Sequence, residues 1–556
     1  MPDENTALGH SFTNYVSNGD KTCTKDGTKT ATCANGCGEK DTLVDEAGHQ
    51  FVDSVCSVCG ITDNINGLIF QLNKKKTEFS VISKAENITT VFVPAYVNNI
   101  PVTRVEHAAF MNEYKIEMVI IPNTVTSIGF EAFMGCSGLR TVILGNGLER
   151  IEPYAFDCND VITSVYYMGT ENDWNNITIY EDGNGSLLNA PREYGNNPSE
   201  GLLYSWHATP QVYVVRGIGS CTDTVLNIPK WHEGKPVTGI GDKAFIGNKN
   251  ITKVILPNSI TYIDYGAFSK CTSLTEITIP DSVQRVGDEA FDNCSSAVSL
   301  KIGSGITSIG AYVFRGCSAL TEIVIPDSVQ AIGEYAFIGC TGALSLKIGS
   351  GVKTIGAWAF KSCVALTEIV IPGNVNKIGA YAFYLCNGAT SLTLSEGVNE
   401  IGAYSFYGCS SIKSIFMPSS LYLVGEYCFT WCSSAESVSI SPSLIKLENY
   451  MFAQCKSLTN VVIPNNITYI GACVFFGCAK LSTVTIGTGV NCIDPNVFAD
   501  CPSLSGIYLT VTTGWHCATS PTPSVWDTLN PTSAANPARM VELMRGPLLA
   551  YYFRRW

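Results

Sequence analysis

A phenylalanine returns every 23 residues through most of this chain. Three such positions lie in the first third of the chain, and twelve follow one another without a slip of register from residue 245 to residue 498. A fixed period of this size is typical of a solenoid, in which each repeat forms one coil and neighbouring coils bury a shared core. The positions are Phe110, Phe133 and Phe156, then Phe245, Phe268, Phe291, Phe314, Phe337, Phe360, Phe383, Phe406, Phe429, Phe452, Phe475 and Phe498.

One copy of the repeat, LTEITIPDSVQRVGDEAFDNC, runs from residue 274 to residue 294. Its first half alternates apolar and polar residues, which predicts a short strand that ends at Pro280. Gly287 to Phe291 is expected to form a short helical or 3₁₀ turn on the opposite side of the coil. The fold class predicted is an α/β solenoid with a face of parallel strands and helical or 3₁₀ turns opposite.

The copies alternate in detail, which points to duplication of a pair of coils. A proline follows the strand in every second copy, at Pro280, Pro326, Pro372, Pro418 and Pro464. The copies between them carry Gly303, Gly349, Ser395, Ser441 and Gly487 at the same place.

The pattern LTEIVIP, SVQAIGEYAFIGC covers about residues 67–511 and keeps its register over twelve consecutive copies; it resembles the BspA-like, treponemal-type leucine-rich repeats of bacterial surface proteins. The resemblance implies a leucine-rich repeat solenoid and a non-catalytic protein, secreted or held at the cell surface. It further implies adhesion, meaning binding of protein or glycan ligands, host extracellular matrix among them. A structural spacer or assembly protein, and the accessory binding region of a larger surface enzyme, are the alternatives.

Four regions are expected along the chain. Residues 1–66 form a small Cys/His-rich module, and residues 67–196 form a first repeat block with an N-terminal cap and a closing insertion. Residues 197–511 form a second block of twelve coils. It has its own cap, because Gly201 to Phe245 repeats the pattern of Gly67 to Phe110. Residues 512–556 read as a Pro/Ser/Thr-rich linker and tail.

Composition excludes several classes of protein. The chain of 556 residues is 46% hydrophobic and 15% charged, which argues against disorder. A net charge of −13 argues against nucleic-acid binding. No apolar run reaches the ~20 residues of a membrane span. The start, MPDENTALGH, does not look like a signal peptide, so an exported form is expected to be mature or trimmed. The six histidines form no catalytic constellation, so no enzymatic activity is expected.

Twelve cysteines share one position, three residues after the marker phenylalanine. Side chains that point in parallel into one core are poorly aimed for disulfides, which favours buried free thiols that contact loop carbonyls. A metal or redox ladder is the alternative. The positions are Cys136, Cys271, Cys294, Cys317, Cys340, Cys363, Cys386, Cys409, Cys432, Cys455, Cys478 and Cys501.

A second group of cysteines lies in residues 1–66 beside two Gly-His-x-Phe units. Histidine with thiolate suits tetrahedral zinc, so a structural zinc site is a hypothesis for this module, with disulfides or unliganded thiols as alternatives. No other cofactor is expected. The candidate ligands are His10, Cys33, Cys37, His49, Cys56 and Cys59.

Two surfaces are candidates for ligand binding. One is a row of aromatic residues two positions before each marker phenylalanine: Tyr312, Tyr335, Trp358, Tyr381, Tyr404, Tyr427 and Tyr450. These rings are expected either to pack on one another or to form an exposed stripe for glycans or proteins. The other is a strip of charges that alternate along the strand face, as a ladder of mutual ion pairs or a binding strip: Glu276, Lys301, Glu322, Lys347 and Glu368.

Overall fold

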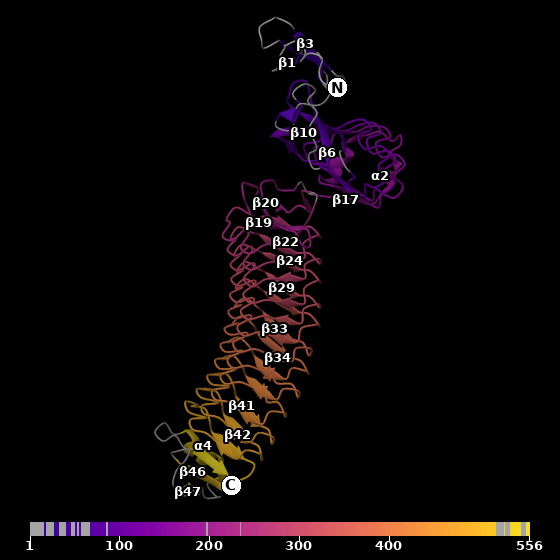
Figure 1. The fold of residues 1–556 in the computed structure, drawn as a ribbon. Helices are drawn as coiled ribbons and strands as arrows, with labels where there is room; N and C mark the ends of the chain where they lie inside the picture. Colours follow the sequence, from indigo (N-terminus) through magenta and orange to yellow (C-terminus); the bar gives the residue numbers. More distant parts are fainter. Residues whose placement is uncertain are drawn as a thin grey trace, which may run out of the picture. The chain divides into compact units, whose positions relative to one another are not determined.

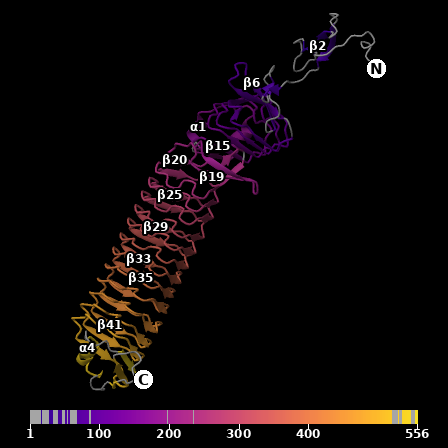
Figure 2. The same cartoon turned by 60° about the vertical axis from the view of Figure 1, so that its left-hand side comes forward.

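The computed structural model describes residues 16–17, 27–32, 40–45, 51–52, 55–56, 67–84, 87–195, 198–233, 235–518, 527–528, 534–545 and 552–555. Contacts within the chain divide it into two compact units, Met1–Pro198 and Ser199–Trp556. Within the second unit, successive coils lie on one another with their strands side by side (Figures 1 and 2). The predicted solenoid is therefore confirmed.

Each repeat coil of the second unit contributes two strands, which pair in parallel with strands of neighbouring coils in short sheets on two sides of the coil. The first strand is the predicted one. In β25 (Glu276–Ile279) Ile277 and Ile279 are buried, and Ile277 lies opposite Leu300 of the next coil. The second strand has only two residues, as in β26 (Arg285–Val286), and was not predicted. A strand of this length leaves too short an alternation to recognise in the sequence.

The strands of the second unit follow in chain order. They are β18 (Leu203–His207), β19 (Val212–Gly217), β20 (Val225–Asn227), β21 (Trp231–His232), β22 (Lys235–Ile240), β23 (Lys253–Ile255), β24 (Tyr262–Ile263), β25, β26, β27 (Ser299–Ile302), β28 (Ser308–Ile309), β29 (Glu322–Ile325), β30 (Ala331–Ile332), β31 (Ser345–Ile348), β32 (Thr354–Ile355), β33 (Glu368–Ile371), β34 (Lys377–Ile378), β35 (Ser391–Leu394), β36 (Glu400–Ile401), β37 (Ser414–Phe416), β38 (Leu423–Val424), β39 (Ser437–Ser439), β40 (Lys446–Leu447), β41 (Asn460–Ile463), β42 (Tyr469–Ile470), β43 (Thr483–Ile486), β44 (Cys492–Ile493), β45 (Gly506–Leu509), β46 (Trp515–Ala518), β47 (Asp527–Thr528) and β48 (Tyr552–Arg555).

The first unit has the same two-sheet coil. One sheet has the order β16-β14-β12-β10-β7-β6 and the other the order β17-β15-β13-β11-β8. Its elements are β1 (Val16–Ser17), β2 (Gly27–Thr32), β3 (Lys40–Asp45), β4 (Phe51–Val52), β5 (Val55–Cys56), β6 (Leu68–Leu72), β7 (Phe79–Lys84), β8 (Thr90–Phe92), β9 (Tyr96–Val97), β10 (Ile100–Val105), β11 (Met118–Ile120), β12 (Ser127–Ile128), β13 (Thr141–Leu144), β14 (Arg150–Ile151), β15 (Ser164–Tyr167), α1 (Glu171–Asn175), β16 (Thr178–Ile179), α2 (Gly185–Asn189) and β17 (Arg192–Tyr194).

Both repeat blocks open with the same device, an antiparallel hairpin that leads into parallel pairing. In the first unit β6 pairs with β7, which then pairs in parallel with β10. In the second unit β18 pairs with β19, which then pairs in parallel with β22. The hairpin covers the first coil, whose apolar edge would otherwise meet water.

The third side of each coil, here called the turn side, is a run of turns. In the coil of Phe337, Ile338 N–H donates to the Tyr335 carbonyl and Cys340 N–H to the Phe337 carbonyl, which is the i→i+3 pattern of 3₁₀ structure. Tyr335 and Gly339 have φ of 57° and 75°, so the turns cannot continue as a regular helix. Phe337 N–H also donates to the Ala359 carbonyl of the next coil, which links the coils on this side too.

The marker phenylalanines form one continuous stack inside each unit. From Phe245 to Phe498 each ring lies parallel to the next, with centroids 5.1–5.8 Å apart. Phe337, for example, is fully buried between Phe314 and Phe360. Burying such a ring contributes roughly 1.5–3 kcal/mol, and no coil could do so alone.

The twelve ladder cysteines are buried free thiols, as the sequence predicted. Each Sγ donates to the carbonyl of the marker phenylalanine in the preceding coil, with sulfur–oxygen distances of 3.1–3.4 Å. Burial raises the pKa of the Cys363 thiol to about 12. In the coil of Phe156 the same position carries Asn159, whose Nδ2 donates to the Phe133 carbonyl. The ladder therefore satisfies a buried carbonyl in each coil.

The alternation between two types of repeat copy has a physical cause at the turn that follows the first strand. The carboxylate of Asp281, next to Pro280, accepts hydrogen bonds from the backbone N–H and the hydroxyl of Ser304 in the next coil. Asp327 accepts the same two bonds from Ser350. These bonds lower the pKa of both carboxyl groups. An acid in one coil thus pairs with a donor in the next, which fits a two-coil unit between Asp281 and Ser350. Farther along, Glu396 accepts the same kind of bonds from Ser419, three coils after Asp327 instead of two.

The described parts of residues 512–556 pack on the last coils, which differs from the linker and tail expected there. β48 pairs antiparallel with β44, and α4 (Pro537–Arg545) contacts β45. Trp515, Met540 and Phe553 are buried in the core of the second unit. Arg554 forms an ion pair with Asp494 at 3.3 Å. The apolar residues of this short segment make it a cap for the open end of the core.

Candidate binding surfaces of the second unit

The seven predicted aromatic residues meet in a single row along the turn side, called here the aromatic ribbon. Consecutive rings are nearly parallel, with interplanar angles of 3–6° and centroids 3.8–5.8 Å apart. All seven side chains are half-buried. The two predicted alternatives, mutual packing of the rings and an exposed stripe, therefore occur together. The rings pack on one another, and part of each side chain still reaches solvent.

Every residue of the aromatic ribbon has left-handed backbone, with φ between 56° and 61°. L-residues reach this region at a cost of about 1–2 kcal/mol each. In other coils of the second unit the same position carries Gly266 and Asn496, which suit it better. The sequence analysis missed this strained position, because lysine, glutamate, tyrosine and tryptophan occupy it as well and hide its preference.

Stacking covers the faces of the internal ribbon rings, while each side chain stays partly exposed. At one end the Arg315 guanidinium lies 4.8 Å from the Tyr312 ring. At the other end a hydrogen bond with Cys473 raises the pKa of Tyr450 to about 12. Burial against neighbouring coils raises the pKa of Tyr404 and Tyr427. A neutral phenol can both donate and accept a hydrogen bond.

A second row beside the ribbon was not predicted. Tyr384 and Tyr407 each follow a marker phenylalanine, and their rings stack with centroids 4.9 Å apart. The Lys361 ammonium lies 4.5 Å from the Trp358 ring and 5.3 Å from the Tyr384 ring. Leu385 is 36% exposed. These residues widen the apolar surface beside the ribbon in only two or three coils, which is too few to produce a periodic signal in the sequence.

The five predicted charges of the strand face do not form the ion-pair ladder considered from the sequence. Glu276 lies opposite Ser299, whereas Lys301 lies opposite Thr278, so acids and lysines occupy different columns of the sheet. Glu322 and Lys347 are separated in the same way, and Glu368 lies opposite Ser391. Within the described part of the chain, no ion pair joins two of the five.

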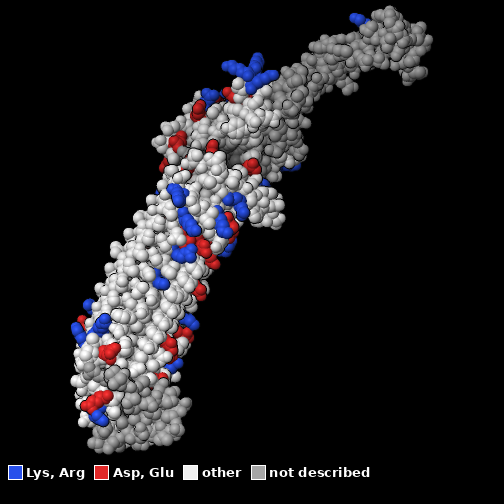
Figure 3. Space-filling model, turned by 90° about the vertical axis from the view of Figure 1, so that its left-hand side faces the viewer, with Lys and Arg blue, Asp and Glu red and all other residues white. Residues whose placement is uncertain are grey.

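Charges of both signs lie close together on the described part of the second unit (Figure 3). Glu276 pairs instead with Lys253 at 2.7 Å. Figure 3 shows one side of the molecule, where Lys, Arg, Asp and Glu lie in small mixed groups around a broad area of uncharged residues.

The proposed zinc ligands cannot be placed. His10, Cys33, Cys37, His49 and Cys59 lie outside the described residues, and for Cys56 only the backbone is described, within β5. The zinc site stays a prediction. Among the residues that are described, no three His, Cys, Asp or Glu side chains gather as a metal site would require.

Stacked coils with parallel strands and an interior of leucine, isoleucine and phenylalanine define a leucine-rich repeat solenoid. The model of the family described as BspA type Leucine rich repeat region (6 copies) matches residues 103–180, 238–365, 307–436, 353–472 and 423–513. The chain belongs to this family, which confirms the resemblance seen in the sequence.

Solved structures of similar chains come from several bacteria. A leucine-rich repeat protein from Bacteroides ovatus is 21% identical, with 76% of this chain and 94% of that chain covered and a TM-score of 0.37. A leucine rich cell surface protein from Faecalibacterium prausnitzii is 21% identical, with 81% and 94% covered and a TM-score of 0.31. The pneumococcal vaccine antigen PcpA is 16% identical, with 81% and 87% covered and a TM-score of 0.22. No curated protein matches the chain.

Membership of this family suggests a non-catalytic repeat protein, since such solenoids are typically non-enzymatic, and a cell-surface or secreted location. Within the described residues, no helix has both the length and the apolar composition that crossing a bilayer requires.

Proposed function

We propose that the second unit is a binding module that presents its turn side to a protein partner, at the cell surface or after secretion. The observation that carries the proposal is the aromatic ribbon. Seven consecutive coils place a half-exposed aromatic residue where the backbone is left-handed. Such a residue costs free energy at this position, so its presence in an unbroken run requires a compensating role.

Stacking between coils offsets this cost but adds little beyond it. Each stacked pair contributes about 0.5–1.5 kcal/mol beyond burial. Each left-handed residue costs about 1–2 kcal/mol, so the two effects nearly cancel along the ribbon. Glycine or asparagine, as at Gly266 and Asn496, would avoid the cost. What the ribbon adds is a row of phenol edges and hydroxyls at the surface.

The geometry favours a protein over a glycan. Sugar rings pack on the open face of an aromatic ring, but neighbours cover both faces of an internal ring such as Tyr381, at 3.8 and 4.6 Å between centroids. Protein interfaces use tyrosine edges and hydroxyls and are enriched in tyrosine, tryptophan and arginine. The exposed Leu385 and Trp431 beside the ribbon add apolar contact area.

The test is binding of the full chain to an array of extracellular matrix proteins and glycans. A protein ligand held at micromolar concentration is expected. The variant Tyr381→Asn with Tyr404→Asn removes two rings while keeping residues that accept left-handed backbone, and is expected to weaken binding at least tenfold. The matched control, Glu322→Gln with Lys347→Gln on the strand face, should bind like the wild type. Binding only to glycans, or equal binding by the ribbon variant, would refute this proposal.

A spacer is the second candidate, because covered ring faces also stiffen the stack of coils. It predicts no ligand and no effect of the ribbon variant on any binding. An accessory role in a larger enzyme predicts that the bound ligand is a substrate of a catalytic partner region.

A further inference from the structure

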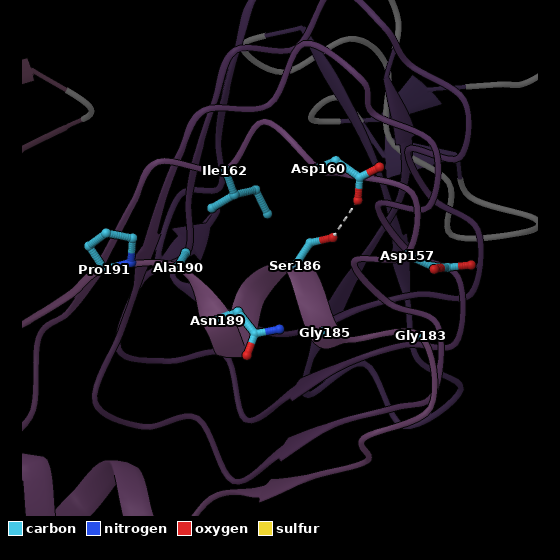
Figure 4. A pocket seen from close by; sticks show the side chains of 9 residues that line it. All are labelled: Asp157, Asp160, Ile162, Gly183, Gly185, Ser186, Asn189, Ala190 and Pro191. Atoms are coloured by element: carbon cyan, nitrogen blue, oxygen red, sulfur yellow. Dashed lines mark hydrogen bonds between the residues drawn. The ribbon is translucent and has the colours of Figure 1, made fainter.

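A pocket lies in the first unit, where the last repeat coil meets the insertion that closes the block. It has a volume of about 530 Å³, which is within the range of small-ligand sites. Its walls are the loop after Phe156 and the short helix α2 with the residues around it. Figure 4 shows the two aspartates on one side and apolar side chains on the other.

The pocket exists because the insertion takes the place of the next coil but supplies only some of its contacts. Elsewhere a marker phenylalanine donates its N–H to a backbone carbonyl of the next coil, as Phe133 does to Ala155. Phe156 donates instead to the side chain of Asn184, at 3.0 Å. Asn184 is fully buried, and its Nδ2 also donates to the carbonyls of Glu152 and Tyr180. The insertion is thus held firmly, but it leaves a space that another coil would fill.

One side of this space is rich in hydrogen-bond acceptors. Asp157 and Asp160 line it, and Ser186 of α2 donates its hydroxyl to Asp160 at 3.3 Å. Asn159, between them in the sequence, is fully buried with an Oδ1 that has no hydrogen-bond partner, but it does not line the pocket. No lysine, arginine or histidine is among the lining residues. The charge of Asp157, followed by burial, a hydrogen bond to Asp157 and the charge of Asp160, raises the pKa of the adjacent Cys158 thiol.

The opposite side is apolar and neutral. Ile162, Ala190 and Pro191 line it, and Asn189 adds an amide at the edge (Figure 4). A metal ion does not fit this lining, because fewer than three ligating side chains gather anywhere in the described residues and half of the wall cannot coordinate. An anion is excluded by the two carboxylates. A positively charged group on an aliphatic chain satisfies both sides at once.

We propose that this pocket binds an organic ammonium group carried on an aliphatic chain, with the ammonium at Asp157 and Asp160 and the chain against Ile162 and Pro191. An ammonium group has three donors for the carboxylate oxygens. The same chemistry occurs in free diamines and in the lysine side chain of a partner protein, and the experiment separates these sources.

The test is calorimetric titration of the full-length protein with 1,5-diaminopentane, and separately with N-acetyl-lysine methylamide. Binding in the micromolar to millimolar range is expected, weaker at high salt. Asp157→Asn and Asp160→Asn should each reduce the affinity about tenfold or more. Asp182→Asn is the matched control, since this exposed acid of the insertion does not line the pocket, and it should bind like the wild type.

Binding of the diamine alone would assign the pocket to free amines. Binding of the lysine derivative would assign it to a protein side chain. Either result supports recognition of an ammonium group on an aliphatic chain. No heat with either probe up to 10 mM, affinity unchanged in both aspartate variants, or displacement of the amine by Ca²⁺ at lower concentration would overturn the proposal. Asp160 is exposed, so its variant should fold even where Asp157→Asn does not. Circular dichroism of each variant verifies this.

Discussion

The thiol ladder makes the second unit sensitive to alkaline pH. Burial raises the pKa of Cys363 and Cys409 from 9.0 to about 12. An unfolded chain therefore ionises these thiols from about pH 9, whereas the folded chain keeps them protonated. The stabilisation is fully present below pH 9 and is lost as the pH rises from 9 to 12.

The size of the effect follows from these two values. At pH 10 each ladder thiol favours the unfolded chain by about 1.4 kcal/mol. The second unit holds eleven of them. If its coils unfold together, the loss is about 15 kcal/mol, as large as the whole stability of a typical domain. We therefore expect the unit to unfold between pH 9 and pH 11.

Urea denaturation at pH 8 and pH 10, in the presence of a phosphine reductant and followed by circular dichroism, measures this loss. The variant Cys363→Ala removes one ionisable thiol. At pH 8 it should be less stable by about 1 kcal/mol, because the Phe337 carbonyl loses its donor. Between pH 8 and pH 10 it should lose about 1.4 kcal/mol less than the wild type. Tyrosine ionisation affects both proteins alike. Equal stability at the two pH values, or equal losses in both proteins, would refute the reasoning.

Other parts of the second unit yield three further predictions. Phe337→Leu removes two ring stacks and Phe498→Leu only one, so the first should cost about 0.5–1.5 kcal/mol more in chemical denaturation; equal costs would contradict a continuous stack. Asp292→Ala strands Arg315, which holds the buried carboxylate at 2.6 and 2.8 Å. Since Arg315 can still reach water, the free energy of unfolding should fall by about 2–3 kcal/mol. A change below 0.5 kcal/mol would show that the ion pair does not contribute to stability. Arg554→Ala breaks the ion pair of the C-terminal cap, so hydrogen exchange in β44 should quicken while exchange in β33 stays unchanged.

The core of this fold was predictable because a side chain repeated in phase leaves a signal in the sequence. Phe314 and Phe337 are 23 residues apart and lie on adjacent coils with stacked rings. The cysteine position was interpretable for the same reason, since a small residue three places after each buried ring falls at one depth. Each of its thiols reaches a carbonyl of the preceding coil.

Backbone conformation was not predictable in this way. The left-handed position at Tyr335 accepts many residue types, since stacking between coils compensates for strain. The second strand of each coil has two residues, too few for a pattern.

Positions that depend on register between coils were also missed. Glu276 and Lys301 are 25 residues apart, two more than the period, so they lie in different columns, as the register of β25 on β27 shows. The cap around Trp515 and Met540 occurs once, so no repetition exposes it.

The hydrogen bonds from Ser304 to Asp281 and from Ser350 to Asp327 bear on how a gene for this protein can change. Recombination that removes 46 residues restores an acid facing a serine at the new junction. Removal of 23 residues around Ser304 would place Asp281 beside Asp327, two like charges about 5 Å apart. Alleles that differ in length between Asp281 and Ser350 should therefore differ by even numbers of coils, in steps of about 10 Å.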